Sequence, residues 1–399
     1  MHDLAGAWRR TAQGAGLLAP DGSSRPTIFA EMSALAARTG AINLGQGFPD
    51  EDGPAVVLDA ARDAIAHGVN QYPPGRGILD LRVAITEHQK RFYGLTLDPE
   101  RDVLVTAGAT EALSATLLAL IAGPEDEVVV FEPFYDSYAA CVALAGARLV
   151  TVPLRRPDFQ PDLDDLRRAV TDRTRLILVN DPHNPTGAVF SAEVRSEVVR
   201  LAERHDAVIV TDEVYEHLVF RDAHVPLSTL PGAWERTLTI SSAGKTFSTT
   251  GWKIGWVSGP AFLLDAVLAV KQFLTYVNGA PFQPAIATGL RLPDAFFRGV
   301  ADELRVKRDL LGAGLRAAGF EVSVPQGSYF TVAAIPTDEG TDAADFCRSL
   351  PERAGVVAIP LTAFVTPERR AEYSRLVRFA ACKRIDVLED AVSRLAVLA

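Results

Sequence analysis

Short apolar runs, each ending in a polar cluster, alternate with amphipathic stretches through the middle of the chain. Five runs rich in valine, leucine and isoleucine lie at 102–107, 127–131, 175–180, 207–211 and 237–240. Because each run is followed by a helical pattern or a turn, the sequence predicts an α/β fold with a largely parallel sheet. Ligands of such sheets bind beyond the carboxyl ends of the strands, so the polar residues after the runs are candidates for one shared site.

The polar cluster after the last run contains Lys245 and Lys253 among small and hydroxyl-bearing residues. They are two of only six lysines among 40 basic residues. A lysine amine can form an imine with a carbonyl, whereas arginine stays protonated and cannot. The Gly-Lys-Thr triplet at 244–246 also ends a phosphate-binding loop motif, but that motif requires glycine where the chain has Thr239. Two interpretations of Lys245 stay open: an imine-forming lysine, or a surface lysine in a turn.

The ends of the other predicted strands carry further polar side chains. Thr110, Tyr135, Asn184, Asp212 and Tyr215 follow the other four runs. Together with the lysine they suit pyridoxal phosphate (PLP), which needs an imine lysine and an acidic partner for its ring nitrogen. Taken singly, Asp212 could cap the next element, Asn184 could be a turn residue, and the tyrosines could be core aromatics.

Six motifs extend along nearly the whole chain. They are Asn43-Leu44-Gly45-Gln46-Gly47-Phe48-Pro49, Asn70-Gln71-Tyr72, Asn184-Pro185-Thr186-Gly187, Asp212-Glu213-Val214-Tyr215, Ser242-Ala243-Gly244-Lys245 and Gly327-Ser328-Tyr329-Phe330. Together they resemble the class I/II PLP-dependent aminotransferases of the kynurenine and methionine aminotransferase type. Three further segments, at 50–54, 72–75 and 131–138, look most like the actinobacterial N-succinyldiaminopimelate aminotransferases.

The resemblance implies a fold-type-I PLP transferase with two domains. The large PLP-binding domain is expected at 53–295, with a mostly parallel seven-stranded sheet between helices. The smaller α+β domain is expected to be discontinuous, formed by 1–52 and 296–399. Within it, the hydrophobic pattern predicts a long helix at 301–318.

The resemblance also implies catalytic and cofactor-binding roles, position by position. Lys245 is expected to hold the cofactor as an imine and to move the proton during the reaction. Asp212 is expected to pair with the pyridinium nitrogen, while Tyr215 and Asn184 hydrogen-bond the phenolic oxygen. Tyr135 is expected to stack on the cofactor ring.

The cofactor phosphate is expected at the start of the helix that begins at Ala109, where free N–H groups and the helix dipole attract an anion. Thr110 and Ser242 would add hydroxyls there, and Lys253 a positive charge. The resemblance implies that Tyr72 reaches the phosphate of a partner subunit. A homodimer is therefore expected.

Substrate binding is expected at Arg378, which lies between apolar residues in a predicted buried strand. A lone buried arginine needs an anion, so a salt bridge to an acidic side chain is the alternative from the residues alone. The resemblance implies a bidentate contact with the substrate α-carboxylate, assisted by Asn184 and Gly47, with Phe29 also at the substrate. It implies no metal site.

The implied activity is the transfer of an amino group from an amino acid to a 2-oxo acid such as 2-oxoglutarate. The expected donor is N-succinyl-LL-2,6-diaminopimelate, an intermediate of lysine biosynthesis. The alternatives are a kynurenine- or methionine-type aminotransferase, a cysteine-S-conjugate β-lyase, and a non-catalytic regulator built on the same fold. The presence of Lys245 argues against the regulator.

Composition narrows the partners and the cellular location that are expected. The net charge of -10 opposes a nucleic-acid or anionic-membrane surface. No apolar run reaches the ~18 residues that a membrane helix requires. Cys141, Cys347 and Cys382 have neither metal-ligand spacing nor an evident pairing, so buried thiols and a reducing, cytoplasmic location are expected.

Overall fold

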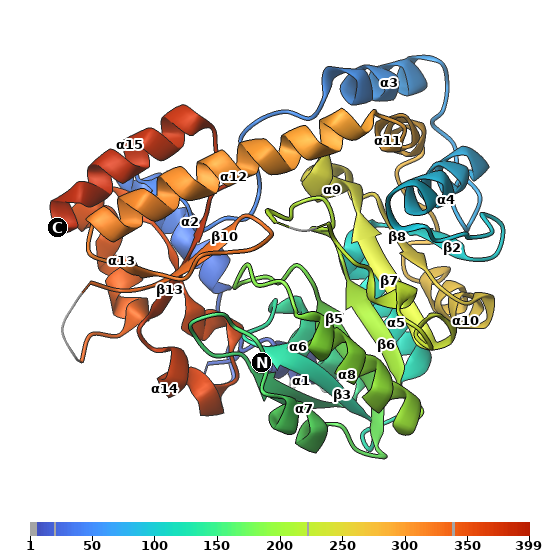
Figure 1. Cartoon of the computed structure of the whole chain (residues 1–399), viewed down its shortest axis with the longest axis horizontal. Coiled ribbons are helices and arrows are strands. Elements are labelled where there is room, and N and C mark those ends of the chain that lie inside the picture. The colour runs from blue at the N-terminus through green and yellow to red at the C-terminus, as the bar shows by residue number, and fades with distance from the viewer. Residues whose placement is uncertain (1–5, 20, 222, 337–339) are drawn as a thin grey trace.

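The computed structural model describes residues 6–19, 21–221, 223–336 and 340–399. Its helices surround one large sheet and two smaller ones (Figure 1). No helix within these ranges is both long and apolar enough to cross a membrane. The α-helices of the described residues are α1 (Ala7–Gly14), α2 (Ile28–Thr39), α3 (Ala55–Ala66), α4 (Leu79–Tyr93), α5 (Gly108–Leu120), α6 (Ser137–Ala145), α7 (Leu163–Ala169), α8 (Ala192–Arg204), α9 (Ala243–Thr246), α10 (Ala261–Lys271), α11 (Phe282–Leu290), α12 (Asp294–Ala317), α13 (Ala343–Ala354), α14 (Arg370–Tyr373) and α15 (Ile385–Leu395).

The large sheet has seven strands in the order β2-β8-β7-β6-β5-β3-β4. Strand β8 runs antiparallel to its neighbours β2 and β7, and the other pairs are parallel. The predicted α/β class and the mostly parallel seven-stranded sheet are therefore confirmed. The strands are β2 (Val103–Thr106), β3 (Glu127–Glu132), β4 (Arg148–Pro153), β5 (Thr174–Asn180), β6 (Val208–Asp212), β7 (Thr237–Ser242) and β8 (Gly255–Ser258).

Alternate side chains of the central strands enter two different apolar clusters, one on each face of the large sheet. In β3, Val128 and Val130 pack in a cluster with residues of α5, α6 and α10. Val129 and Phe131 belong instead to the cluster that contains residues of α8. Successive side chains of an extended strand point to opposite faces, which explains this division. Both faces are therefore covered, as a largely parallel sheet requires.

The C-terminal part forms a four-stranded antiparallel sheet in the order β12-β13-β10-β9. Helix α12 packs on it and begins at Asp294, earlier than the predicted helix at 301–318. The earlier start follows from Pro293, which precedes the first turn, and from the acidic Asp294 within that turn, where the helix dipole favours it. The strands are β9 (Glu321–Val322), β10 (Phe330–Ala334), β12 (Ile359–Pro360) and β13 (Leu376–Ala380).

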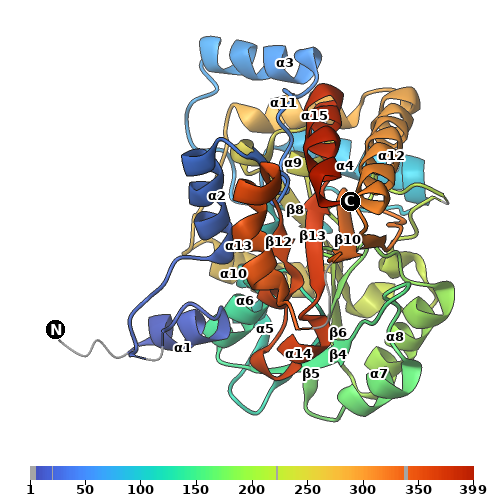
Figure 2. The same cartoon turned by 90° about the vertical axis from the view of Figure 1, so that its left-hand side faces the viewer.

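The N-terminal segment packs with this C-terminal part. Strand β1 (Ile42–Asn43) pairs in parallel with β11 (Val356–Val357). Helix α2 lies beside α13, as Figure 2 shows. This arrangement agrees with a discontinuous smaller domain, although the division at 53–295 stays a prediction.

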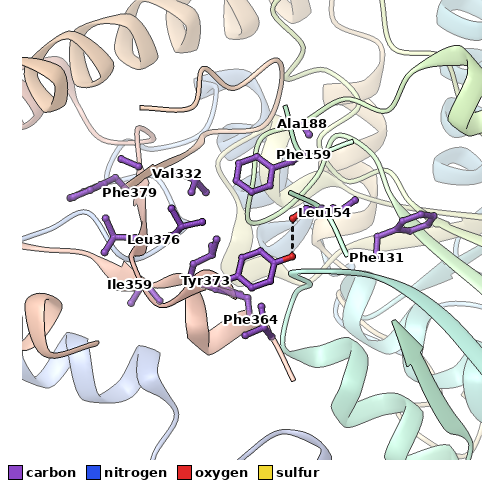
Figure 3. Close-up of a cluster of buried hydrophobic side chains, with 14 of the residues drawn as sticks. Phe131, Leu154, Phe159, Ala188, Val332, Ile359, Phe364, Tyr373, Leu376 and Phe379 are labelled. Carbon is purple, nitrogen blue, oxygen red and sulfur yellow. Dashed lines mark hydrogen bonds between the residues drawn. The ribbon is translucent and has the colours of Figure 1, made fainter. Parts of the chain in front are cut away.

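A buried cluster joins the large sheet to the C-terminal sheet (Figure 3). Phe131 of β3 belongs to the same apolar cluster as Val332 of β10 and Phe379 of β13. Within it, the Tyr373 hydroxyl donates to the carbonyl oxygen of Leu154 over 2.8 Å. Because this contact area is removed from water, it stabilises the packing of the two sheets against each other.

Candidate active site

A cavity of about 440 Å³ lies at the carboxyl ends of β5, β6 and β7. The last residues of these strands, Asn180, Asp212 and Ser242, line it directly. The fold thus gathers the polar residues that follow the predicted strands. Besides Asp212 and Ser242, the predicted site residues that line the cavity are Phe29, Gly47, Ala109, Thr110, Tyr135, Asn184, Tyr215, Lys245, Lys253 and Arg378.

The amine of Lys245 faces this cavity from the short helix α9. Ser242 caps the helix by accepting a hydrogen bond from the Gly244 N–H over 3.2 Å. The Lys245 nitrogen lies 5.8 Å from the ring centres of Tyr215 and Tyr329, and it has no hydrogen bond within the described residues. Burial lowers the pKa of Lys245. A lower pKa increases the share of neutral amine, which is the form that attacks a carbonyl.

Asp212 ends β6 and is held by Tyr138, to which the sequence pattern gives no role. The Tyr138 hydroxyl donates to Oδ2 of Asp212 over 2.6 Å. Asn180 fixes the backbone, because its side-chain amide donates to the Asp212 carbonyl oxygen over 2.8 Å. Burial raises the pKa of Asp212, while the bond from Tyr138 opposes that rise. The carboxylate is therefore oriented and desolvated, as a partner for a buried cation requires.

Arg378 is a buried cation without a carboxylate partner among the described residues. Its side chain is 2% exposed and lies on β13. Nη1 donates to Oδ1 of Asn184 over 3.0 Å, and Nη2 donates to the Gly45 carbonyl oxygen over 2.7 Å. Nε has no hydrogen-bond partner within the described ranges. The salt bridge that was the alternative is not formed, and burial lowers the pKa of Arg378 to about 10.

Two neutral donors complete this side of the cavity. Because Oδ1 of Asn184 accepts from Arg378, the NH₂ group of the same amide is available to donate. Tyr215 is buried edge-on to Tyr329, with ring centres 5.3 Å apart. Burial raises the pKa of Tyr215, so its hydroxyl keeps the proton at neutral pH. Burial likewise raises the pKa of Tyr135 to about 12.

The start of α5 forms the opposite side of the cavity. No side chain caps this helix, so the first N–H groups are open to an anion. Gly108 has a φ of +76°, and a Cβ there would lie 3.0 Å from the Lys253 ammonium. The ammonium is therefore next to the first turn. The Ser242 hydroxyl donates to the Ile254 carbonyl oxygen over 3.3 Å, and Thr110 is exposed to the cavity.

Gly47 lies where no larger residue fits. A Cβ at this position would lie 2.6 Å from Cζ of Phe330. The Gly47 carbonyl accepts a hydrogen bond from the Tyr329 hydroxyl over 2.5 Å. Phe29 reaches the same region, and its ring centre is 5.5 Å from the Arg378 guanidinium. These contacts place an apolar wall around the arginine.

Tyr72 does not line the cavity of its own chain. Its side chain is 81% exposed and contacts only the edge of Tyr276 among the rings of the described residues, with ring centres 5.6 Å apart. A single chain therefore leaves the expected role of Tyr72 untested.

A second cluster of buried polar side chains includes Glu216 and His217, which directly follow Tyr215 in the sequence. Nε2 of His88 lies 2.6 Å from Nε2 of His217, and the Ser241 hydroxyl donates to Glu216 over 2.6 Å. Burial lowers the pKa of His88 to about 3 and also lowers that of His217. Both imidazoles are therefore neutral, and one ring donates its N–H to the other. The side-chain atoms of His88, Glu216 and His217 that could bind a metal ion lie within 4.8 Å of one another. The expectation that the protein has no metal site therefore stays a prediction.

Comparison with known proteins identifies the family. The sequence profile of aminotransferase class I and II matches residues 39–395. The chain belongs to this family. Class I and II aminotransferases depend on PLP and act on amino acids and 2-oxo acids. The predicted resemblance and the enzyme class are thereby confirmed.

Several aminotransferases are similar over nearly their full length. A probable N-succinyldiaminopimelate aminotransferase of Mycobacterium tuberculosis is 54% identical, covering 94% of this chain and 96% of the relative. The Escherichia coli methionine aminotransferase is 37% identical, covering 92% and 95%. The solved N-succinyldiaminopimelate aminotransferase from M. tuberculosis superposes with a TM-score of 0.90, covering 94% of this chain and 97% of that one.

Proposed function

We propose that this aminotransferase uses PLP to move the amino group of N-succinyl-LL-2,6-diaminopimelate to 2-oxoglutarate. The 54% identity with the M. tuberculosis relative is the observation that supports this donor. The chemistry is supported by the cavity, which combines a Lys245 amine and a buried Arg378 that have no carboxylate partner among the described residues.

The residues around the cavity fit the cofactor. Lys245 would hold it covalently, and Asp212 would pair with its ring nitrogen. The start of α5, with Lys253 beside it, would bind the phosphate, while Tyr215 and the amide of Asn184 would donate to the phenolic oxygen. When bound, the cofactor supplies an electron sink for bond changes at the α-carbon of the amino acid.

The substrate would be bound by its α-carboxylate. The guanidinium of Arg378 has an unused Nε donor and matches a carboxylate in shape. With the carboxylate held there, the neutral Lys245 amine would take the proton from the α-carbon. The apolar wall of Phe29 and Phe330 would exclude water, which strengthens each charge interaction inside the cavity.

We also infer a homodimer in which Tyr72 serves the cofactor of the partner subunit. The exposed Tyr72 lies beside Tyr276, and the nearby Phe273 is 85% exposed. Exposed aromatic groups of this kind favour an interface. Sedimentation analysis of the holoenzyme tests this, because a monomer would leave Tyr72 without a role.

The donor is tested by a substrate panel with the purified holoenzyme and 2-oxoglutarate. N-succinyl-LL-2,6-diaminopimelate should give the highest kcat/KM, measured as glutamate formed. Preference for kynurenine or methionine would replace the proposed donor. Pyruvate and ammonia released from cysteine conjugates without an added 2-oxo acid would identify a β-lyase.

The three cysteines are free and buried, as expected. The cytoplasmic location stays a prediction.

A further inference from the structure

A second cavity, also of about 440 Å³, adjoins the active-site cavity. It lies between the N-terminal segment around α1 and α2 and the C-terminal part around α13 and α14, elements that lie on the near side in Figure 2. Thr27 and Asp136 line both cavities. The two cavities therefore share part of their lining, and a ligand whose reacting end is held at Arg378 would have to pass these two residues to reach the second cavity.

Three arginines line the second cavity, and two of them have no acidic partner in the part of the chain that the structure describes. Arg348 is paired with Glu31 at 2.9 Å and with Asp345 at 3.2 Å. Arg25 has a single side-chain hydrogen bond, from Nη2 to the Leu18 carbonyl oxygen over 2.8 Å, and forms no ion pair within the described residues. Arg370 forms neither a hydrogen bond from its side chain nor an ion pair there. Arg25 and Arg370 therefore have guanidinium N–H groups available to donate hydrogen bonds to an anion.

Most of the carboxylates in the second cavity are already in use. Glu31 accepts from Arg348, and Asp342 caps α13 by accepting from the Ala344 N–H over 2.7 Å. Asp136, at the junction of the two cavities, has a backbone hydrogen bond from the adjacent Ser137 and forms no ion pair with a side chain of the described residues. A carboxylate at this place can accept a hydrogen bond from an amide N–H, a group that every N-acylated donor carries.

This inference rests on the proposed function, because the chemistry of the proposed donor matches this arrangement. One end of N-succinyl-diaminopimelate is an ordinary amino acid, which the active-site cavity would hold. The far end carries two carboxylates, one on the heptane chain and one on the succinyl group, linked through an amide. We propose that Arg25 and Arg370 form a subsite for these two distal carboxylates. Planar guanidinium groups suit this role because each can make two parallel hydrogen bonds to one carboxylate.

The test compares Arg25→Gln, Arg370→Gln and the double variant with the wild type. Kinetics are measured with N-succinyl-LL-2,6-diaminopimelate and with methionine, which has no distal charge. Each single change should raise KM for the succinylated donor about tenfold, with a smaller effect on kcat, because a charge-assisted hydrogen bond is lost. The ratio of kcat/KM for the two donors should fall accordingly. Arg38→Gln, an exposed arginine of α2 outside both cavities, is the matched control and should keep the wild-type ratio.

The possible failures can be told apart. If the wild type uses the succinylated donor and both single variants keep its donor ratio, the subsite is wrong and the proposed function stands. If the wild type does not use that donor, the proposed function fails, and the variants are compared on 2-aminoadipate, which has one distal carboxylate. A lower relative activity of the variants on 2-aminoadipate would still support an anion subsite, and an unchanged one would overturn it. Thermal melting of each variant checks that its fold is intact.

Discussion

The phenol of Tyr138 donates a 2.6 Å hydrogen bond to Oδ2 of Asp212, and both side chains are buried. Tyr138 comes from α6 and Asp212 from the end of β6, so the contact joins a helix to the strand edge that forms the site. The bond opposes the rise in the pKa of Asp212 that burial causes. Tyr138 therefore acts as a positioning residue that helps to keep this carboxylate ionised.

Replacing this phenol should shift the pH dependence of the reaction. In Tyr138→Phe, the pKa of Asp212 should rise because a bond to its charged form is lost. If ionised Asp212 is required, the acidic limb of the kcat profile moves to higher pH, and kcat falls about tenfold. Steady-state kinetics across pH measures both effects. An acidic limb that stays in place would show that Tyr138 has only a packing role.

Lys245 should be the one lysine that binds the cofactor covalently. In Lys245→Ala, turnover should fall about 10³-fold or more, since the other lysine that lines the cavity, Lys253, lies beside Gly108 at the start of α5. Borohydride reduction followed by peptide mass spectrometry should find the cofactor on Lys245 in the wild type. Lys253→Ala is the control: it should keep the covalent bond and weaken only the cofactor affinity. A modified peptide in the Lys245 variant would contradict the assignment.

Arg378 should hold the substrate and not the cofactor. Arg378→Lys keeps the charge but loses the planar pair of donors, so KM for amino-acid donors should rise about tenfold or more. Cofactor affinity, measured by titration of the apoenzyme, should change little. If the variant loses the cofactor while the affinity for a dicarboxylate inhibitor is unchanged, Arg378 is structural and the substrate carboxylate is held elsewhere.

The buried pair His88 and His217 should make the fold sensitive to acid. Burial lowers the pKa of His88 to about 3, whereas an unfolded chain has a histidine pKa of about 6.5. Its contribution to stability is complete above pH 6.5 and is lost progressively as the pH falls from about 6.5 towards 3, because the unfolded state binds the proton more strongly.

At pH 5 the loss from His88 amounts to about 2 kcal/mol of the free energy of unfolding. Urea unfolding of the holoenzyme at pH 7 and pH 5 measures it. His88→Gln should show a smaller difference between the two pH values than the wild type. His67→Gln, at an exposed histidine of the same chain, should match the wild type. Equal pH dependence in all three proteins would exclude the pair as the cause.

The sequence predicted the parts of the fold that depend on local pattern. Strands β3, β5, β6 and β7 are continuous apolar runs because both faces of the sheet are covered, and the polar residues after β6 and β7 reach the cavity for the same topological reason. Strand β4 was not predicted, because it lies at the sheet edge with partly exposed positions. Strand β8 was not predicted, because it begins with Gly255 and is followed by Gly259, and glycines are typical of turns.

Pairings between distant segments could not be predicted in the same way. The bond from Tyr138 to Asp212 and the approach of Arg25 and Arg370 to one cavity depend on how elements pack in three dimensions. Nothing in the spacing of these residues along the chain encodes that packing. The pattern around Arg378 indicated that it is buried, and the resemblance placed Asn184 near it, but the hydrogen bond to the Gly45 carbonyl became visible only in the fold.

The pairing of β1 with β11 affects the order in which contacts form while the chain is synthesised. Ile42 lies beside Val356, so the N-terminal strand has no partner until almost the whole chain has left the ribosome. The central sheet can form earlier, because β3 and β4 are neighbours along the chain as well as in space. Contacts between distant segments form late because closing a long loop costs entropy before any contact is gained. A nascent chain therefore carries an unpaired N-terminal segment through most of synthesis, and a protein truncated before β11 keeps that segment without its partner.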